Sequence, residues 1–83
     1  MKDTILAIKI NGRVAHAPKV QEILTQYGCN IKTRVGFHEA NEDHCAMDGI
    51  LILQLFGNEE AIQNMHDKLK DVDGVVPKFI NFD

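Results

Sequence analysis

The sequence has no long apolar run, few cysteines and no excess of positive charge, and each absence narrows the classes of protein that it can encode. No stretch approaches the roughly 20 apolar residues that cross a bilayer, because Lys9 interrupts the run that begins at Ile5. The first residues also lack the apolar core and the small-residue cleavage site of a secretory signal. We therefore expect a cytoplasmic protein without a membrane partner, in which Cys29 and Cys45 are thiols.

The charge of the chain is slightly negative and unevenly distributed. The formal net charge is −3, from 9 Lys and Arg against 12 Asp and Glu. Four acidic residues and no basic residue lie in the segment 38–48, namely Glu39, Glu42, Asp43 and Asp48. Nucleic-acid-binding proteins generally present a basic stripe or patch, and the sequence contains none. We expect no direct binding to nucleic acid.

The length of 83 residues fits one domain, 1–83, and leaves no room for a second core. Hydrophobic residues make up 45% of the chain and charged residues 25%, which are ordinary values for a folded protein. A chain this short is marginally stable alone and usually gains stability from a disulfide, a metal or a partner subunit. Its composition therefore predicts a folded domain and favours association.

The hydrophobic pattern predicts strands and helices in the order βαββαβ. Strand-like apolar spacing occurs at residues 4–11, 30–37, 50–56 and 75–82. Helical spacing occurs at residues 18–27 and 59–72. Pro18 suits a first helical turn, Gly28 a helix end and Asn58 an N-cap. This order predicts an α+β, ferredoxin-like sandwich, with a four-stranded antiparallel sheet in the spatial order 4-1-3-2 and both helices on one face.

The predicted topology leaves one face of the sheet without helices. The third strand is apolar on both sides, which suits a central position, and Pro77 suits an edge strand. We assign four apolar side chains to the open face: Ile5, Leu51, Leu53 and Leu55. An exposed apolar patch usually marks an interface, although a few apolar residues on an open sheet are tolerated. We expect a homo-oligomer, a dimer or a tetramer, that associates through this face.

Side chains that bind transition metals converge at one end of the predicted sheet. The loop after the first strand contains His16, and the hairpin between the second and third strands contains His38, His44 and Cys45. Neutral imidazole and thiolate are preferred ligands of zinc, nickel, copper and iron, so a divalent transition metal is the candidate cofactor. The segment 38–48 is also typical of a solvated polar hairpin, because an adjacent His-Cys pair has no diagnostic spacing.

The sequence gives little support for catalysis. A Cys–His nucleophile needs an oriented pair, whereas adjacent residues of an extended chain point in opposite directions. There is no glycine-rich phosphate loop and no HExxH motif, so we expect no enzyme activity. We expect Cys29 to be a buried small hydrophobe and His66 to pack at the boundary of the core or to be solvated. We expect Lys32 and Arg34 to face away from the helices.

Several segments resemble known families. Tyr27-Gly28-Cys29-Asn30-Ile31 resembles the end of the first helix of ACT domains, which sense amino acids in metabolic regulation. An alignment on Gly28 places the ACT ligand loop on residues 11–16, so the resemblance implies ligand-binding residues among Asn11, Gly12, Arg13 and His16. ACT domains often carry Asp-Arg-Pro-Gly there, of which this chain keeps only the Arg.

Three further segments are similar to stand-alone ACT-like proteins described as regulators of an iron-only hydrogenase system. They are Arg34-Val35-Gly36-Phe37, residues 49–53, and Asp73-Gly74-Val75 followed by Lys78. The chain also resembles the C-terminal domain of nickel-responsive regulators. His38 matches one His of their metal site and Cys45 falls one residue late, whereas Gly36 stands in place of a second His. Their DNA-binding ribbon-helix-helix arm has no counterpart in these residues.

The resemblance implies a stand-alone, homo-oligomeric ACT-like regulatory or binding protein, a transcriptional regulator without a DNA-binding domain of its own. The first alternative is a transition-metal-binding or metal-sensing protein that uses His16, His38, His44 and Cys45. The second alternative is a structural adaptor that binds a partner protein through its sheet.

Overall fold

The computed structural model describes the backbone of residues 4–11, 17–40 and 45–82, and the side chains of residues 4–11, 18–36 and 49–82. The elements along the chain are β1 (Thr4–Ile10), α1 (Ala17–Gln26), a short 3-10 helix (Gly28–Asn30), β2 (Ile31–Ala40), β3 (Cys45–Leu55), α2 (Glu59–Lys70) and β4 (Val75–Asn81). Within these residues, no helix is long and apolar enough to cross a membrane.

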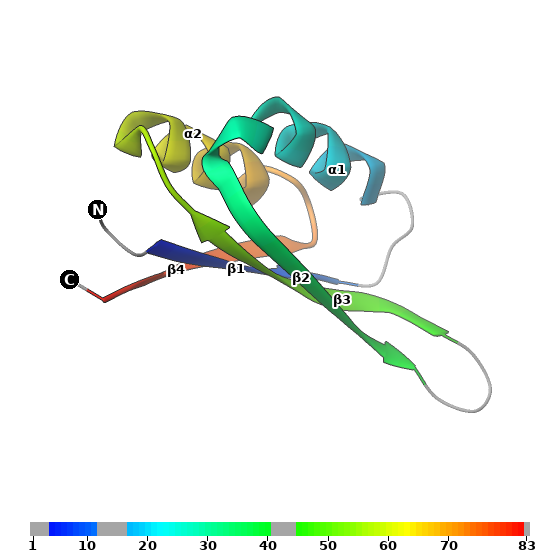
Figure 1. The fold of residues 1–83 in the computed structure, drawn as a ribbon. Coiled ribbons are helices and arrows are strands. Elements are labelled where there is room, and N and C mark those ends of the chain that lie inside the picture. Colours follow the sequence, from blue (N-terminus) through cyan, green and yellow to red (C-terminus); the bar gives the residue numbers. More distant parts are fainter. Residues whose placement is uncertain (1–3, 12–16, 41–44, 83) are drawn as a thin grey trace.

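The four strands form one antiparallel sheet in the order β2-β3-β1-β4. Both helices lie on the same face of this sheet, and the opposite face carries no element of the described chain (Figure 1). The predicted ferredoxin-like βαββαβ architecture is confirmed, including a central β3 and an edge position for β4, the strand that contains Pro77.

The hydrophobic core lies between the helices and the sheet. Its buried apolar side chains are Leu6, Ile8, Val20, Ile23, Leu24, Leu53, Leu55, Ile62, Met65, Leu69 and Val75. Full burial of a Leu, Ile or Met side chain contributes about 1.5–3 kcal/mol. The core therefore depends on one stripe of each helix and on alternate residues of β1 and β3.

The prediction of which β3 residues lie on the open face is wrong. Leu6 pairs with Leu53 and Ile8 pairs with Leu51, so these residues share the face that the helices cover. Leu53 and Leu55 are buried in the core, and Leu51 packs against it. A shift of one residue in register moves every side chain of a strand to the other face, and β3 is apolar on both. Only Ile5 lies on the open face as predicted.

Two other side chains differ from expectation. Arg34 Nη2 donates a hydrogen bond of 2.9 Å to Gln21 Oε1 on α1, so Arg34 lies on the helix side of β2 and not on the open face. The neighbouring register irregularity between Ile31 and Thr33 explains this difference, because a bulge shifts the alternation of the strand. Cys29 is exposed and not buried, because it lies in the short 3-10 turn on the surface.

The loops at one end of the sheet are connected by Asn30. Its Nδ2 donates to the Phe56 carbonyl at 3.1 Å, and the Phe56 N–H donates to the Asn30 carbonyl at 3.0 Å. The next residue, Gly57, has φ of 95°, and a Cβ on it would lie 2.9 Å from Asn30 Nδ2. The chain then enters α2 through Asn58, whose Oδ1 accepts from the N–H groups of Glu60 and Ala61.

The β2–β3 hairpin extends past the end of the neighbouring strand β1. β1 pairs with residues 49–55 of β3, so residues 45–48 of β3 continue past the end of β1. The first of them, Cys45, is opposite Ala40 at the end of β2, and the register of the two strands is irregular between His38 and Ala40. Figure 1 shows this part of the hairpin projecting from the body of the molecule.

Candidate functional site

The predicted ligand loop and the extended hairpin share one end of the sheet. Ile10, the last residue of β1, pairs with Gly49 on β3 and with Val75 on β4. The next residue, Asn11, is exposed, and its N–H donates to the Gly74 carbonyl at 2.7 Å. This bond connects the start of the predicted ligand loop to the turn before β4.

The other residues of the predicted sites lie at or beyond the limits of the described chain. Gly12, Arg13, His16 and His44 lie outside the described residues. His38 pairs with Gly49 and Cys45 pairs with Ala40, so both belong to the hairpin strands, but their side chains are outside the described set. Both sites therefore stay predictions. Among the side chains that the structure describes, those of residues 4–11, 18–36 and 49–82, no group of three or more metal-binding residues comes together.

The open face of the sheet consists of residues in three rows across the strands. The first row contains Thr33, Gln54, Ile5 and Ile80, the second contains Val35, Ile52, Ala7 and Lys78, and the third contains Ile50, Lys9 and Val76. Directly opposite residues of antiparallel strands project to the same side, so each row forms a line of neighbouring side chains.

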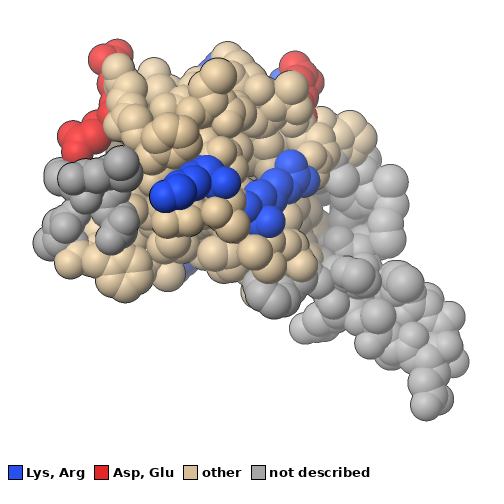
Figure 2. Space-filling view, in the orientation of Figure 1, with Lys and Arg blue, Asp and Glu red and all other residues tan. Residues whose placement is uncertain are grey.

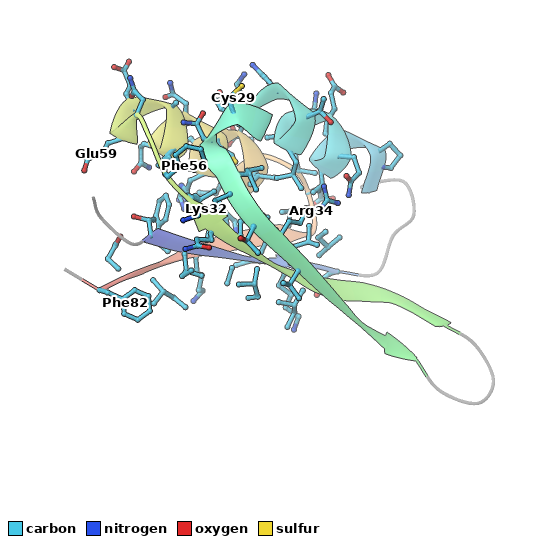
Figure 3. The ribbon with its side chains drawn as sticks, viewed as in Figure 1. Cys29, Lys32, Arg34, Phe56, Glu59 and Phe82 are labelled. Carbon is cyan, nitrogen blue, oxygen red and sulfur yellow. The ribbon has the colours of Figure 1, made fainter. Side chains whose placement is uncertain are left out.

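Large apolar side chains on this open face are unusually exposed. Val35, Ile50, Val76 and Ile80 are each 43–46% exposed, and Phe82, just after β4, is 69% exposed. Figure 3 places Phe82 on the side of the sheet away from the helices. The ionic side chains of the three rows are Lys9 and Lys78, both exposed and both cationic. Exposed apolar patches of this kind are typical of interaction sites.

The edge strand β2 carries two basic side chains. Figure 2 shows basic side chains in the middle of this view, where Figure 3 labels Lys32 and Arg34. Both residues are exposed, and Arg34 is held by Gln21. The acidic side chains of Figure 2 lie toward the outside of the helical layer.

A small cleft lies at the other end of the sheet, beside the first turn of α2. Its volume is about 220 Å³, and its lining consists of Thr4, Glu59, Ile62, Gln63, Phe79 and Asn81. No pattern in the sequence indicates this cleft, because its residues come from three elements that meet only in the fold. It holds no cluster of buried polar groups, since no polar or charged residue is buried in the part of the chain that the structure describes.

His66 packs beside this cleft, which confirms the expected boundary position. Its ring stacks on Phe79 with 4.9 Å between ring centroids, and its Nδ1 lies 3.0 Å from Asp67 Oδ1. Gln63 Nε2 donates to the same Asp67 oxygen at 3.0 Å. The hydrogen bond with His66, followed by the one from Gln63, lowers the pKa of the Asp67 carboxyl below its ordinary value. The stack of His66 on Phe79 is the contact of this group that joins α2 to β4.

The fold is similar to several solved structures. The uncharacterized protein TM1266 from Thermotoga maritima is 26% identical, with a TM-score of 0.84 over 99% of this chain and 98% of that chain. The ACT domain of a GTP pyrophosphokinase from Chlorobium tepidum is 16% identical, with a TM-score of 0.63 over 96% and 97% of the two chains.

A third structure is CPII, a nitrogen regulatory PII-like protein from Thiomonas intermedia K12, bound to ADP, AMP and bicarbonate. It is 14% identical, with a TM-score of 0.59 over 100% of this chain and 94% of that chain. No family model and no curated protein matches the chain. The likenesses establish an ACT-like, ferredoxin-like fold.

Proposed function

We propose that this chain is an ACT-like regulatory or binding protein that forms a homo-oligomer and reaches its targets without binding DNA directly. The observation that carries the proposal is the open face of the sheet, with its rows of exposed apolar side chains. The sequence resembles regulators of an iron-only hydrogenase system, and we include a relation of this chain to those regulators in the same proposal.

The energetic argument for association rests on the half-exposed residues of the open face. Full burial of such a side chain contributes about 1.5–3 kcal/mol, so covering one that is nearly half exposed adds roughly 1 kcal/mol. Val35, Ile50, Val76 and Ile80 together supply about 4 kcal/mol per copy before the losses of association. Phe82 adds further area at the end of the same face.

Sedimentation velocity at micromolar concentration tests the association. The wild-type protein should sediment as a dimer or larger, and Ile80→Lys should shift it toward monomer. Phe56→Lys is the matched control, because Phe56 is also an exposed apolar residue but lies in the loop between β3 and α2. A wild-type monomer at this concentration would refute the proposal.

The second part of the proposal is that a small regulatory ligand binds at the end of the sheet where β1 finishes. Support comes from the fold, since the similar PII-like protein binds ADP, AMP and bicarbonate, and from the ACT-like loop. The residues in question are Asn11, Gly12, Arg13 and His16. Thermal-shift measurements with amino acids and adenine nucleotides test it. A ligand that stabilises the wild type should not stabilise Arg13→Ala but should still stabilise the surface control Lys19→Ala.

A transition-metal site in the hairpin is the alternative function. The observation in its favour is that β2 and β3 pair directly there, with His38 opposite Gly49 and Ala40 opposite Cys45. Calorimetric titration with Ni²⁺ or Zn²⁺ tests it. Binding should weaken below about pH 6, because imidazole must lose its proton to act as a ligand. The double substitution His38→Ala and Cys45→Ala should abolish binding, whereas His66→Ala should retain it.

A further inference from the structure

The two edge strands of the sheet differ in the hydrogen-bonding groups that they leave free. In an antiparallel sheet, the peptide groups of successive residues point alternately toward one neighbouring strand and away from it. At the β1–β4 pair, the Asn11 N–H donates to the Gly74 carbonyl. Counting from this bond, Val76 and Lys78 also bond to β1, whereas Pro77 faces the free edge. Because Pro has no N–H, the edge of β4 lacks a donor at its centre.

The edge of β2, in contrast, keeps its donors and acceptors. The Phe56 N–H, just after β3, donates to the Asn30 carbonyl, just before β2. Counting from this bond, the even-numbered residues of β3 bond to β2. Arg34 and Gly36 are opposite odd-numbered residues of β3, so their own N–H and C=O groups point to the free edge. Residues 32–36 are all exposed. This part of β2 can therefore pair with a further strand.

The free edge of β2 carries positive charge only. Lys32 and Arg34 lie in residues 31–36, which contain no Asp or Glu, although the whole chain has a net charge of −3. Figures 2 and 3 place basic side chains together along β2, with the acidic side chains of this view toward the outside of the helical layer. Arg34 is held by its hydrogen bond to Gln21, so its charge keeps a fixed position beside the strand. The edge therefore favours an acidic partner.

The side chains of β2 also define what can lie beside them. Arg34 and Gly36 are on the helix side, opposite Leu53 and Leu51, whereas Val35 is on the open face and is 44% exposed. Gly36 adds no side chain, and a glycine within a strand often marks a place where another backbone approaches closely. Directly opposite residues of neighbouring strands project to the same side. An added strand would therefore place acidic side chains beside Arg34 and apolar ones beside Val35.

We propose that the free edge of β2 binds an extended acidic segment of a partner protein, which adds to the sheet as a fifth strand. The β2 strand of a second copy is a poor occupant, because two-fold pairing brings Lys32 and Arg34 of both copies together. Two cations are also few for nucleic acid, whose binding depends on neutralising several phosphates. This binding uses peptide groups at the edge and is independent of the self-association proposed above.

Fluorescence anisotropy with a labelled peptide of alternating Val and Glu, about six residues long, tests the proposal. A Glu opposite Arg34 must turn its own N–H toward β2, so the Glu N–H groups bond to the protein and the Val N–H groups point away. N-methylation of the Glu residues should therefore abolish binding, whereas N-methylation of the Val residues should retain it. The two methylated peptides carry the same charge, so this comparison separates strand addition from charge attraction. A peptide with Lys in place of Glu should not bind.

Charge reversal in the protein gives a second readout. Lys32→Glu and Arg34→Glu should each weaken the binding of the Val-Glu peptide about 10-fold, most strongly at low salt. The double variant should instead bind the peptide that carries Lys. Lys70→Glu is the matched control, because Lys70 is an exposed cation in the last turn of α2 and should leave binding unchanged. Equal losses for Lys70→Glu and Arg34→Glu would overturn the proposal.

Substitution of Gly36 tests the backbone of the edge directly. Gly36→Pro removes an outward N–H, as Pro77 does on β4, and should abolish peptide binding. Gly36→Ala is the matched control, because both changes add a Cβ about 3.2 Å from Leu51 Cδ2 but only Ala keeps the N–H. Gly36→Ala should therefore bind the peptide, and urea unfolding should show that both variants fold. A folded Gly36→Pro variant that binds as the wild type does would refute strand addition.

Amide hydrogen exchange of the wild-type protein locates the added strand. The N–H groups of Arg34 and Gly36 should exchange rapidly in the protein alone and become protected when the Val-Glu peptide binds, whereas those of Thr33 and Val35 should be protected in both states. Wild-type protein that does not bind the peptide, or equal binding of the two N-methylated peptides, would overturn the proposal. Arg34→Glu should sediment as the wild type does. A loss of peptide binding with unchanged sedimentation thus separates this proposal from the self-association of the open face.

Discussion

The contact between Asn30 and Gly57 allows a quantitative prediction for Gly57→Ala. Gly57 has φ of 95°, a conformation that costs a residue with a Cβ about 1–2 kcal/mol. The new Cβ would lie 2.9 Å from Asn30 Nδ2, which must move and lose its hydrogen bond to the Phe56 carbonyl, at a cost of about 1 kcal/mol. The free energy of unfolding should therefore fall by about 2–3 kcal/mol, which lowers Tm by roughly 10–20 °C in a chain of this size.

A double-mutant cycle in urea separates the two contributions. Asn30→Ala alone should cost about 1 kcal/mol, and Gly57→Ala in that background should cost only the backbone part, so the double variant should be about 1 kcal/mol more stable than the sum of the singles. Gly28→Ala is the matched control, because a Cβ there meets no atom within 4 Å and φ is not positive. Equal effects at Gly28 and Gly57, or strict additivity in the cycle, would refute the reasoning.

Three further predictions concern the core, a helix cap and the pH dependence of stability. Leu53→Ala should lower the free energy of unfolding by about 2–5 kcal/mol because Leu53 is fully buried, whereas Ile50→Ala should change the stability of the monomer by much less, as measured by urea unfolding. Asn58→Ala should cost about 1 kcal/mol in the same assay, because it leaves two N–H groups of α2 without their side-chain acceptor. Since the pKa of Asp67 is lowered in the folded state, its stabilisation is present above the pKa of the unfolded chain and is lost as pH falls through the folded-state value. Urea unfolding between pH 6 and pH 2.5 should therefore show a smaller loss of stability for Asp67→Asn than for the wild type.

The topology could be predicted from the sequence because local signals agreed with one another. The unbroken apolar run of β3 suits a central strand, and Pro77 suits the edge position of β4. The faces of β3 could not be predicted in this way, since both sides of the strand are apolar and a register slip of one residue exchanges them. The side that packs under the helices is decided by the pairing of Leu6 with Leu53.

Single side chains show the same limit of local reasoning. The position of Arg34 depends on an irregularity in β2, which no residue in the sequence marks, and on Gln21 from a different element. Cys29 is exposed because the chain forms a 3-10 turn before β2, although a small hydrophobic side chain is compatible with burial. In contrast, strand order alone places the end of β1 and the hairpin at the same end of the sheet, so this placement could be predicted from the sequence.

The edges of the sheet bear on how the protein behaves when concentrated. An unpaired edge strand can recruit further strands and lead to amyloid-like growth, which natural proteins discourage with prolines and charges. Here one edge is β4, in which Pro77 lacks a donor and Lys78 adds charge. The other edge is β2, which carries the exposed cations Lys32 and Arg34. Both edges therefore resist open-ended addition of strands. Concentrated solutions of this protein should contain discrete oligomers and no fibrils.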